Sequence, residues 1–522
     1  MQLTHHNSTF YLTGDKDFLK RTAEGWHHRE DGTLWTTNPF AASLQLTHAD
    51  AATRDFFRPK LERLKLSRAE SSFFPCTELS GGLPLDDTQR VGVEWAVKTP
   101  HTLIADPMGS GKTAMALVSA NTLGAERILV LCPAIVKQNW HREFGRFYIH
   151  QTDDLEVVYG SNHKLTKKRI IMNYDLVHRP AMLEQLQKLK FDLIIFDEIH
   201  NLKSLEAKRT QACLSLEGVY HLAERHIALS GTPLTSRPKE LYPTFISFAP
   251  DALTPHQDYF DFTRQFCGAY KDRFGWNDKG ASNLKELNFR LRTSFMLRRP
   301  PELFRKSAPT IVYQSVDLKN HKEYLDIENS LLSAPEYASV LEDLDSDFMM
   351  KKSEKSNQNL GDAAKMRVRL SELKIPPVID FIKETLASDE KIVVFCHHSV
   401  MVRGIIEQVG ERRCVKITGD TPTKEREKAV ERLTSDTSVK VLVGNIQAAG
   451  TGLDGLQHAA HICLFAETTW TPGEIDQAIA RLDRRGQTQQ VYAYFLTVKG
   501  SIDEMIMGSI NNKRNTLKEV LQ

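Results

Sequence analysis

The sequence predicts an α/β protein with two parallel-sheet lobes in tandem, helical insertions and a small N-terminal accessory domain. From about Leu83 to Met296, short β-branched runs alternate with amphipathic helical stretches, a pattern typical of parallel α/β domains. A second series of the same kind begins near Lys391. The 522 residues are enough for about three domains, each with its own buried core.

Apolar runs in both series predict the strands. The first series contains HTLIAD, RILVLCP, RIIMNYD, FDLIIFDE and HIALSGT, and the second contains KIVVFCHH, RCVKITG, KVLVGN, HICLFAE and VYAYFLT. We expect an accessory domain at 1–78, a first lobe at 79–300, a helical insertion or linker at 301–375, and a second lobe with a C-terminal brace helix at 376–522. In the accessory domain, GWHHREDGTLWTTN predicts a hairpin that turns at Asp31-Gly32.

Composition restricts the class of protein. Lys and Arg total 68 against 66 Asp and Glu, so any surface for a polyanion must be a local arrangement. The seven cysteines are scattered and form no C-x-x-C pair, which argues against a zinc finger and fits a reduced intracellular protein. No apolar run has the length of a signal peptide core or a membrane span. We therefore expect a cytoplasmic protein that has no membrane partner.

The strongest motif is DPMGSGKT, which runs from Asp106 to Thr113 between a predicted strand and a predicted helix. Its glycines let backbone N–H groups approach phosphate oxygens, while Lys112 reaches the β and γ phosphates and the Thr113 hydroxyl ligates magnesium. The flanking strand and helix disfavour the alternative, a glycine-rich turn with an incidental lysine. We expect ATP and Mg²⁺ here, bound by Met108, Gly109, Ser110, Gly111, Lys112 and Thr113.

Two acidic residues, Asp197 and Glu198, end the apolar run FDLIIFDE. One carboxylate at a strand end can hold Mg²⁺ against the nucleotide, and the next can orient and deprotonate the attacking water. Such a strand end alone is more often solvated, but the phosphate loop about eighty residues upstream favours catalysis. We assign the metal to Asp197 and the general base to Glu198. The turn SGTP, which starts at Ser230, is a candidate link between nucleotide state and nucleic-acid contact.

Arg481 and Arg484 lie three residues apart, which would place both on one face of a predicted helix. Two guanidiniums on one face can reach across a cleft and stabilise charge on the γ-phosphate, so we assign both a catalytic and a nucleotide-binding role. The alternative is a surface helix with solvated arginines. Upstream, NIQAAGTGLD supplies a second glycine-rich loop after a strand, and Gly452 and Asp454 join the predicted nucleotide-binding residues.

Taken in order, these motifs resemble those of Swi/Snf-type ATPases within the superfamily-two helicases, over about residues 83–522. The resemblance implies two tandem RecA-like P-loop lobes and DNA-dependent ATP hydrolysis. LPLDDTQRVGVEW is similar to the adenine-sensing Q motif, whose glutamine is Gln89 here, and CPAIVKQNW is similar to the first DNA-contacting motif. The DNA contacts implied by the resemblance are at Pro133, Lys137, Arg237, His397 and Trp470.

Four further stretches resemble the annealing-helicase branch, the HARP-like remodellers of stalled forks: SGTPLTSRPKELY, FGWNDKGASNLKEL, SFMLRRP, and SELKIPPVIDFIKETL running into VVFCHH. The resemblance implies a translocase that remodels or reanneals branched double-stranded DNA. A strand-separating helicase and the motor subunit of a restriction or defence complex are the alternatives. Because no chromatin-type module is recognisable, we expect a compact bacterial or phage enzyme, with replication, repair or defence proteins as candidate partners.

The segment before the motor motifs mixes aromatic and basic residues around its predicted hairpin: Trp26, His27, His28, Arg29, Trp35 and Phe40. Such a surface suits stacking on exposed bases or wedging into a branch point. The alternative is a small core in which the two tryptophans simply pack. By its position alone, we expect this segment to select the DNA structure on which the motor acts.

Overall fold

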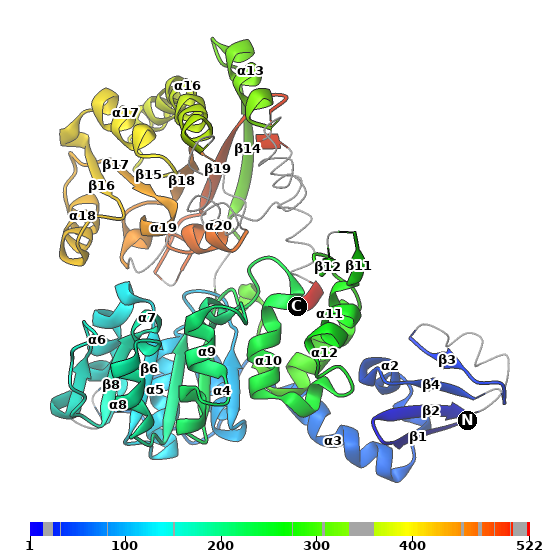
Figure 1. Cartoon of the computed structure of the whole chain (residues 1–522). Helices are drawn as coiled ribbons and strands as arrows, with labels where there is room; N and C mark the ends of the chain where they lie inside the picture. The colour runs from blue at the N-terminus through cyan, green and yellow to red at the C-terminus, as the bar shows by residue number, and fades with distance from the viewer. Residues whose placement is uncertain are drawn as a thin grey trace. The chain divides into compact units, whose positions relative to one another are not determined.

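The computed structural model describes residues 1–13, 25–31, 33–80, 82–149, 152–273, 275–304, 308–332, 360–449, 454–467, 472–484, 486–501, 503–504 and 519–521 (Figure 1). The chain folds into two compact units. The first consists mainly of residues 1–303 together with 516–522, and the second mainly of residues 304–515. Each unit contains one large parallel sheet.

The sheet of the first unit has seven strands in the order β13-β5-β10-β9-β6-β8-β7, with every neighbouring pair parallel. The five predicted strands are confirmed as β5 (His101–Ile104), β6 (Ile128–Cys132), β8 (Arg169–Asn173), β9 (Leu193–Asp197) and β10 (His226–Leu229). Sequence analysis did not predict the two edge strands, β7 (Leu155–Val157) and β13 (Met296–Leu297).

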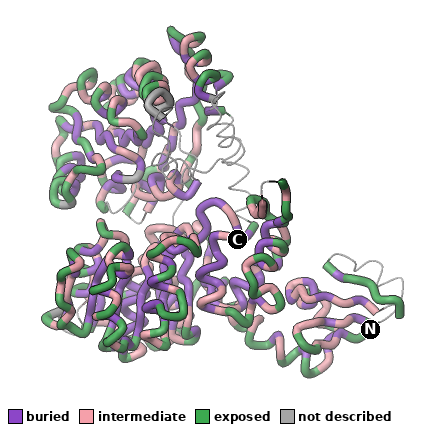
Figure 2. The backbone as a smooth tube through the Cα atoms, in the orientation of Figure 1, coloured by how far each residue is buried: buried purple, intermediate pink, exposed green. Residues whose placement is uncertain are grey.

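Both faces of this sheet are buried, which explains why its central strands read as unbroken apolar runs. Along β9, Ile194 and Phe196 belong to one core cluster, and Leu193 and Ile195 belong to another. Figure 2 shows this burial along the strands. The α-helices of this part are α4 (Asp87–Lys98), α5 (Lys112–Leu123), α6 (Lys137–Phe147), α7 (Tyr174–Val177), α8 (Pro180–Gln187), α9 (Lys208–Leu214), α10 (Tyr242–Phe248), α11 (Tyr259–Cys267) and α12 (Leu284–Ser294). A short hairpin, β11 (Tyr270–Asp272) with β12 (Gly275–Asn277), precedes α12.

The N-terminal part is a four-stranded antiparallel sheet in the order β1-β2-β4-β3, followed by two helices. The predicted hairpin is confirmed, since β3 and β4 pair antiparallel on either side of Asp31-Gly32. The bounds are β1 (Gln2–His6), β2 (Thr9–Thr13), β3 (His27–His28), β4 (Leu34–Thr36), α2 (Pro39–Ser43) and α3 (Ala51–Leu66). Its core includes Phe10, Phe57 and, from α12, Phe289, so this small sheet packs against α12 within the first unit.

The second unit has a six-stranded parallel sheet in the order β14-β19-β18-β15-β17-β16. The five predicted strands are confirmed as β15 (Ile392–Cys396), β16 (Cys414–Ile417), β17 (Val441–Asn445), β18 (Ile462–Phe465) and β19 (Tyr492–Val498). The edge strand β14 (Thr310–Val316) comes from the range that the sequence analysis assigned to the linker. Among the described residues of this unit, the α-helices are α13 (His321–Leu332), α16 (Leu360–Ala387), α17 (Ser399–Val409), α18 (Thr423–Ser435), α19 (Ile446–Ala449) and α20 (Pro472–Ile479).

The end of the chain returns to the first unit. Val520 and Leu521 are buried in one of its core clusters. Asn288 Nδ2 donates to the Val520 carbonyl at 2.7 Å, and an Arg292 guanidinium nitrogen donates to the Leu521 carbonyl at 3.1 Å. Most of the predicted brace helix lies outside the described residues.

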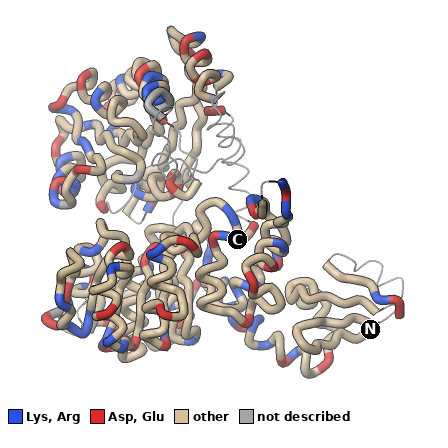
Figure 3. Tube along the Cα trace, in the orientation of Figure 1, with Lys and Arg blue, Asp and Glu red and all other residues tan. Residues whose placement is uncertain are grey.

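Basic and acidic residues are interspersed along the chain trace. Figure 3 shows both kinds in both units. Among the described helices, none combines the length and the apolarity needed to cross a bilayer.

Candidate nucleotide site

The phosphate loop lies between β5 and α5, as the motif predicts. Gly109 and Gly111 have φ angles of +77° and +84°, which glycine adopts at no steric cost. A Cβ at Gly111 would overlap Nε2 of Gln89. The other amide atom of this side chain, Oε1, accepts from the Asp86 backbone N–H at 3.0 Å in a capping box at the start of α4. The predicted base-sensing glutamine therefore lies directly against the loop.

Lys112 points back into the loop that precedes it. Its Nζ donates to the carbonyls of Asp106 at 3.0 Å and Pro107 at 3.1 Å. Burial lowers the pKa of Lys112, while the nearby carboxylates of Glu198, Asp106 and Asp197 act in the opposite direction. The ammonium is therefore close both to the backbone that would surround a phosphate and to the two predicted catalytic acids.

Asp106, which replaces the usual first glycine of the loop, anchors the loop through an ion pair with Arg299 in which both side chains are fully buried. The Arg299 backbone N–H also donates to Asp106 Oδ1, at 2.9 Å. The same guanidinium donates to the Thr88 carbonyl at the start of α4. The neighbouring Arg298 donates to the carbonyls of Ala105 and Gly231. Two consecutive arginines after β13 thus connect the start of the phosphate loop to α4 and to the turn after β10.

The two acids at the end of β9 have different partners. Trp140 Nε1, from α6, donates to Asp197 Oδ2 at 2.8 Å. Burial, and next the charge of Glu198, raise the pKa of Asp197 to about 7. The Thr113 hydroxyl and the Asp197 carboxylate are oxygen donors of the kind that Mg²⁺ prefers, and a divalent cation beside Asp197 would stabilise its ionised form. These residues fit the predicted metal role.

Glu198 is held in an unusual backbone conformation, with a φ of +52°. Asn201 supports it, because its backbone N–H and its Nδ2 donate to the Glu198 carbonyl at 2.9 and 2.8 Å. At the carboxylate, Ser230 Oγ donates to Oε2 at 3.1 Å, and His200 Nδ1 lies 3.3 Å from the same oxygen. A left-handed glutamate is sterically unfavourable and recurs at functional sites. The SGTP turn is therefore in direct contact with the predicted general base.

Of the three predicted DNA-contacting residues in the first unit, one is buried and two are partly exposed. Lys137 is buried, and its Nζ donates to the Val158 carbonyl at 2.7 Å and to Asn173 Oδ1 at 3.2 Å. Pro133 follows β6 and Arg237 precedes the 3₁₀ helix η6 (Pro238–Leu241), and both are partly exposed. A direct DNA contact by Lys137 stays a prediction, since its ammonium already has two protein acceptors.

The sequence analysis missed Trp140 as a site residue. It lies three residues after Lys137 in the quoted stretch CPAIVKQNW, on the same helix. The available signal was this helical spacing together with an indole N–H, which needs an acceptor when it is buried. Trp140 is fully buried and finds that acceptor in Asp197.

The prediction that Arg481 and Arg484 share one face of a helix is wrong, because α20 ends at Ile479. Beyond it the backbone tightens into turns, with Arg481 N–H donating to the Ala478 carbonyl at 3.2 Å. Arg484 Nη1 donates to Asp454 Oδ1 at 2.8 Å, so two of the predicted nucleotide-binding residues are in contact. The predictions for Gly452 and Trp470 fall outside the described residues.

In the second unit, His397 lies at the carboxyl end of β15. Glu467 Oε2 accepts from the backbone N–H groups of His397 at 2.7 Å and His398 at 2.9 Å, and Oε1 is 2.7 Å from His398 Nδ1. Burial alone would raise the pKa of Glu467, but these hydrogen bonds lower it to about 2. Asn445 Nδ2 donates to the His397 carbonyl at 2.9 Å, so the loop that carries His397 is fixed by β17 and β18.

The N-terminal aromatic residues divide between the two faces of the small sheet. Trp26 is buried in the core, as the packing alternative predicted. Tyr11, Trp35 and His27 lie opposite one another across β2, β4 and β3, and all three are at least partly exposed. The Trp35 and His27 rings are 4.5 Å apart, and the Arg29 guanidinium lies 4.8 Å from the Tyr11 ring centroid. This outer face is an aromatic row with a cation at its edge.

Two known domain families match this chain, one over each series of motifs. The SNF2-related domain matches residues 88–367, and the helicase conserved C-terminal domain matches residues 374–486. The chain is 30% identical over 481 residues to the SWI/SNF-related matrix-associated actin-dependent regulator of chromatin subfamily A-like protein 1 of Bos taurus, covering 90% of this chain and 48% of that protein. It is 29% identical over 442 residues to the human DNA annealing helicase and endonuclease ZRANB3, covering 81% and 39% respectively.

The chain thus spans about half the length, or less, of the curated relatives it matches. Among solved structures, the Sulfolobus solfataricus SWI2/SNF2 ATPase core in complex with double-stranded DNA is similar at 20% identity, with a TM-score of 0.38, over 84% of this chain and 97% of that one.

The Trp140–Asp197 hydrogen bond yields a direct test. Trp140→Phe keeps the buried ring but removes the N–H donor, so we expect ATP turnover to fall about tenfold and the Mg²⁺ requirement to rise, as is usual when a hydrogen bond to a metal-binding carboxylate is lost. Steady-state hydrolysis measured over a Mg²⁺ titration gives both values.

Trp95→Phe is the matched control, because Trp95 is also fully buried in the same unit and donates through Nε1 to the Phe295 carbonyl at 3.4 Å, away from the acids. Equal effects of the two substitutions on the Mg²⁺ titration would show that Trp140 only supports packing.

Proposed function

Because the chain belongs to the SNF2-related domain family, we propose that it is a DNA-dependent ATPase that translocates on double-stranded DNA and remodels or reanneals branched duplexes. The observation that carries the proposal is the contact of Ser230, in the SGTP turn, with Glu198, beside the phosphate loop. The relatives that are named annealing helicases support the choice of substrate.

In the proposed reaction, the loop amides and Lys112 bind the β and γ phosphates, and Glu198 orients the attacking water and accepts its proton. Thr113 and Asp197 are the residues that would hold Mg²⁺, whose chemistry here is to neutralise charge on the phosphate oxygens. Gln89, against the loop, is the proposed adenine-sensing residue. Arg481 and Arg484 are the proposed arginine fingers, and Asp454 holds Arg484 in position.

Two hydrogen bonds are the proposed route by which DNA influences hydrolysis. Trp140 belongs to α6, which begins at the proposed DNA-contacting Lys137, and it donates to Asp197. Ser230 belongs to the turn that leads to the proposed DNA-contacting Arg237, and it donates to Glu198. Movement of either segment on DNA binding would shift a carboxylate of the hydrolytic pair.

Strand separation is the competing activity within the same superfamily. Reannealing is favoured by the four sequence stretches that resemble the annealing branch and by the relatives that are named annealing helicases. Bacterial or phage origin, and replication, repair or defence partners, remain predictions from the sequence.

Substitutions in the phosphate loop and the acid pair test the enzymatic proposal. We expect Lys112→Ala to abolish ATP turnover and ATP-dependent reannealing, because the ammonium that holds the transferring phosphate is lost. Glu198→Gln should keep nucleotide bound but unhydrolysed. Nucleotide binding, turnover and reannealing of a forked duplex are measured for each variant.

Lys188→Ala and Glu184→Gln are matched controls, since these residues form an exposed ion pair on α8 in the same unit. Near-normal ATP hydrolysis by Lys112→Ala or by Glu198→Gln would contradict the role proposed for that residue. ATP-dependent unwinding of a tailed duplex without reannealing would favour the strand-separating alternative.

The outer aromatic face of the N-terminal sheet is the proposed surface for unpaired bases at a junction. Stacking of one base on an aromatic ring contributes about 1–3 kcal/mol, so Trp35→Ala should weaken fork binding by roughly tenfold or more. Plain duplex binding, which depends mainly on phosphate contacts, should change less. Affinities for fork and duplex are compared at one salt concentration.

Trp35→Phe, which keeps a stacking ring, is the control and should retain most of the fork affinity. Base stacking at this face would be contradicted if Trp35→Ala lost the same affinity for fork and for duplex. It would also be contradicted if Trp35→Phe lost as much fork affinity as Trp35→Ala.

A further inference from the structure

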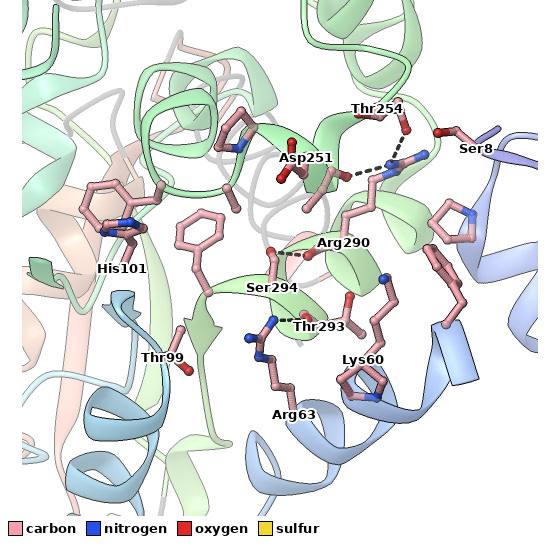
Figure 4. Close-up of a pocket in the computed structure, with 18 of the residues that line it drawn as sticks. Ser8, Lys60, Arg63, Thr99, His101, Asp251, Thr254, Arg290, Thr293 and Ser294 are labelled. Carbon is pink, nitrogen blue, oxygen red and sulfur yellow. Dashed lines mark hydrogen bonds between the residues drawn. The ribbon is translucent and has the colours of Figure 1, made fainter. Parts of the chain in front are cut away.

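A cavity of about 670 Å³ lies between the N-terminal sheet, α3, α12 and the 3₁₀ helix η7 (Pro250–Leu253) of the first unit (Figure 4). It reaches Pro100 and His101 at the amino end of β5, whereas the phosphate loop follows the carboxyl end of that strand. The cavity is therefore separate from the candidate nucleotide site.

One face of α3 forms a wall of this cavity. Phe56, Pro59, Lys60 and Arg63 all line it, and they are spaced at i, i+3, i+4 and i+7, which is one stripe of a helix. Figure 4 shows Lys60 and Arg63 extending from α3 into the space below α12. The sequence thus directs two cations and an aromatic ring into one cavity.

The two α3 cations that line the cavity, Lys60 and Arg63, have no acidic partner among the described residues. Within the described part of the chain, no carboxylate lies within ion-pair distance of Lys60 or Arg63. The Lys60 ammonium instead lies 3.6 Å from the centre of the Phe56 ring. Arg63 makes one long hydrogen bond, 3.5 Å, to the Thr293 carbonyl. Among the described lining residues the sole carboxylate is that of Asp251, which is exposed.

Arg290 is the third cation of the cavity, and the hydrogen bonds of its guanidinium are made within the protein. It is almost fully buried and forms an ion pair with Glu286 at 2.7 Å. It also donates to the carbonyls of Ala252 at 2.6 Å and Thr254 at 3.0 Å. Its donors are used by the protein, so Lys60 and Arg63 are the cations left for a ligand.

The electrostatics of the cavity favour an anion. Burial, followed by the charges of Arg63 and Arg290, lowers the pKa of Lys60 to about 8. A half-buried ammonium without an acceptor is costly, and a bound anion would remove that cost. His5 adds a further polar group, because its Nε2 is buried and has no hydrogen-bond partner among the described residues. The charged side chains that line the cavity are three cations and one carboxylate.

We propose that this cavity binds a phosphate-bearing ligand of mononucleotide size, with the phosphate on Lys60 and Arg63. The volume is within the range of small-molecule sites, about 300–1,000 Å³. Four aromatic rings line the remainder and suit a planar base: Phe10, Phe56, Phe248 and Phe295. A free nucleotide and the terminal nucleotide of a DNA strand share this chemistry. The proposal stands independently of the motor function.

Calorimetric titration of the full chain tests the proposal. The ATP site is first saturated with a non-hydrolysable ATP analogue and Mg²⁺, in the absence of DNA, and pyrophosphate is then titrated. We expect one further site. Each charge-assisted hydrogen bond accounts for roughly a tenfold change in affinity or more. The double variant Lys60→Gln with Arg63→Gln should therefore weaken pyrophosphate binding at this site by about a hundredfold.

Arg54→Gln with Lys65→Gln is the matched control, since it removes two exposed cations of the same helix that do not line the cavity. This pair should bind pyrophosphate normally. Lys60→Arg keeps the charge, so its pyrophosphate affinity should be within about threefold of that of the unmodified chain. This variant shows whether substitution at this position is tolerated. Three outcomes would each overturn the proposal. The first is that pyrophosphate finds no further site, and the second is that both double variants lose the same pyrophosphate affinity. The third is that Lys60→Arg loses as much affinity as Lys60→Gln with Arg63→Gln.

Competition identifies the source of the phosphate. A nucleoside monophosphate that displaces pyrophosphate, when a 5′-phosphorylated single strand does not, indicates a free nucleotide. Displacement by the 5′-phosphorylated strand but not by the same strand with a 5′-hydroxyl indicates a strand end. Displacement by the 5′-hydroxyl strand as effective as by the phosphorylated one would contradict recognition of a terminal phosphate group.

Discussion

Two adjacent carboxylates at the carboxyl end of a buried parallel strand are the constraint around which the first unit is arranged. Asp197 and Glu198 place two carboxylates side by side at a partly buried position, where donors from elsewhere in the fold stabilise them. Trp140 supplies one from α6, Ser230 supplies another from the turn after β10, and Lys112 lies nearby in the phosphate loop. Elements distant in the sequence are thereby held around the proposed hydrolytic pair.

A second buried interaction holds the phosphate loop itself. Asp106 and Arg299 are fully buried, and removal of one partner from such a pair typically costs about 3–5 kcal/mol. The pair connects the start of the loop to the segment that follows β13, and through the Thr88 carbonyl to α4, where Gln89 contacts the loop. This explains why an aspartate occupies a position where a loop of this type more often has glycine.

The sequence was sufficient for the features that depend on local pattern. All ten strands expected from apolar runs are present, because nine of them are central parallel strands and the edge strand β16 still has three of its four residues buried. The short edge strands β7 and β13 offer too few residues for a pattern, and β14 is largely exposed at a sheet edge. Arg481 and Arg484 were expected on a helix because spacing cannot reveal where α20 ends. The contacts of Trp140 and Lys137 depend on residues far along the chain, which no local pattern encodes.

We propose that contact with DNA controls hydrolysis through the hydrogen bonds that reach Asp197 and Glu198. ATP turnover by the unmodified chain, measured at one salt concentration without DNA and with single-stranded, double-stranded and forked DNA, tests it most directly. We expect low turnover without DNA and strong stimulation by duplex and forked DNA, with single strands less effective. Turnover that is equally fast with and without DNA would contradict it.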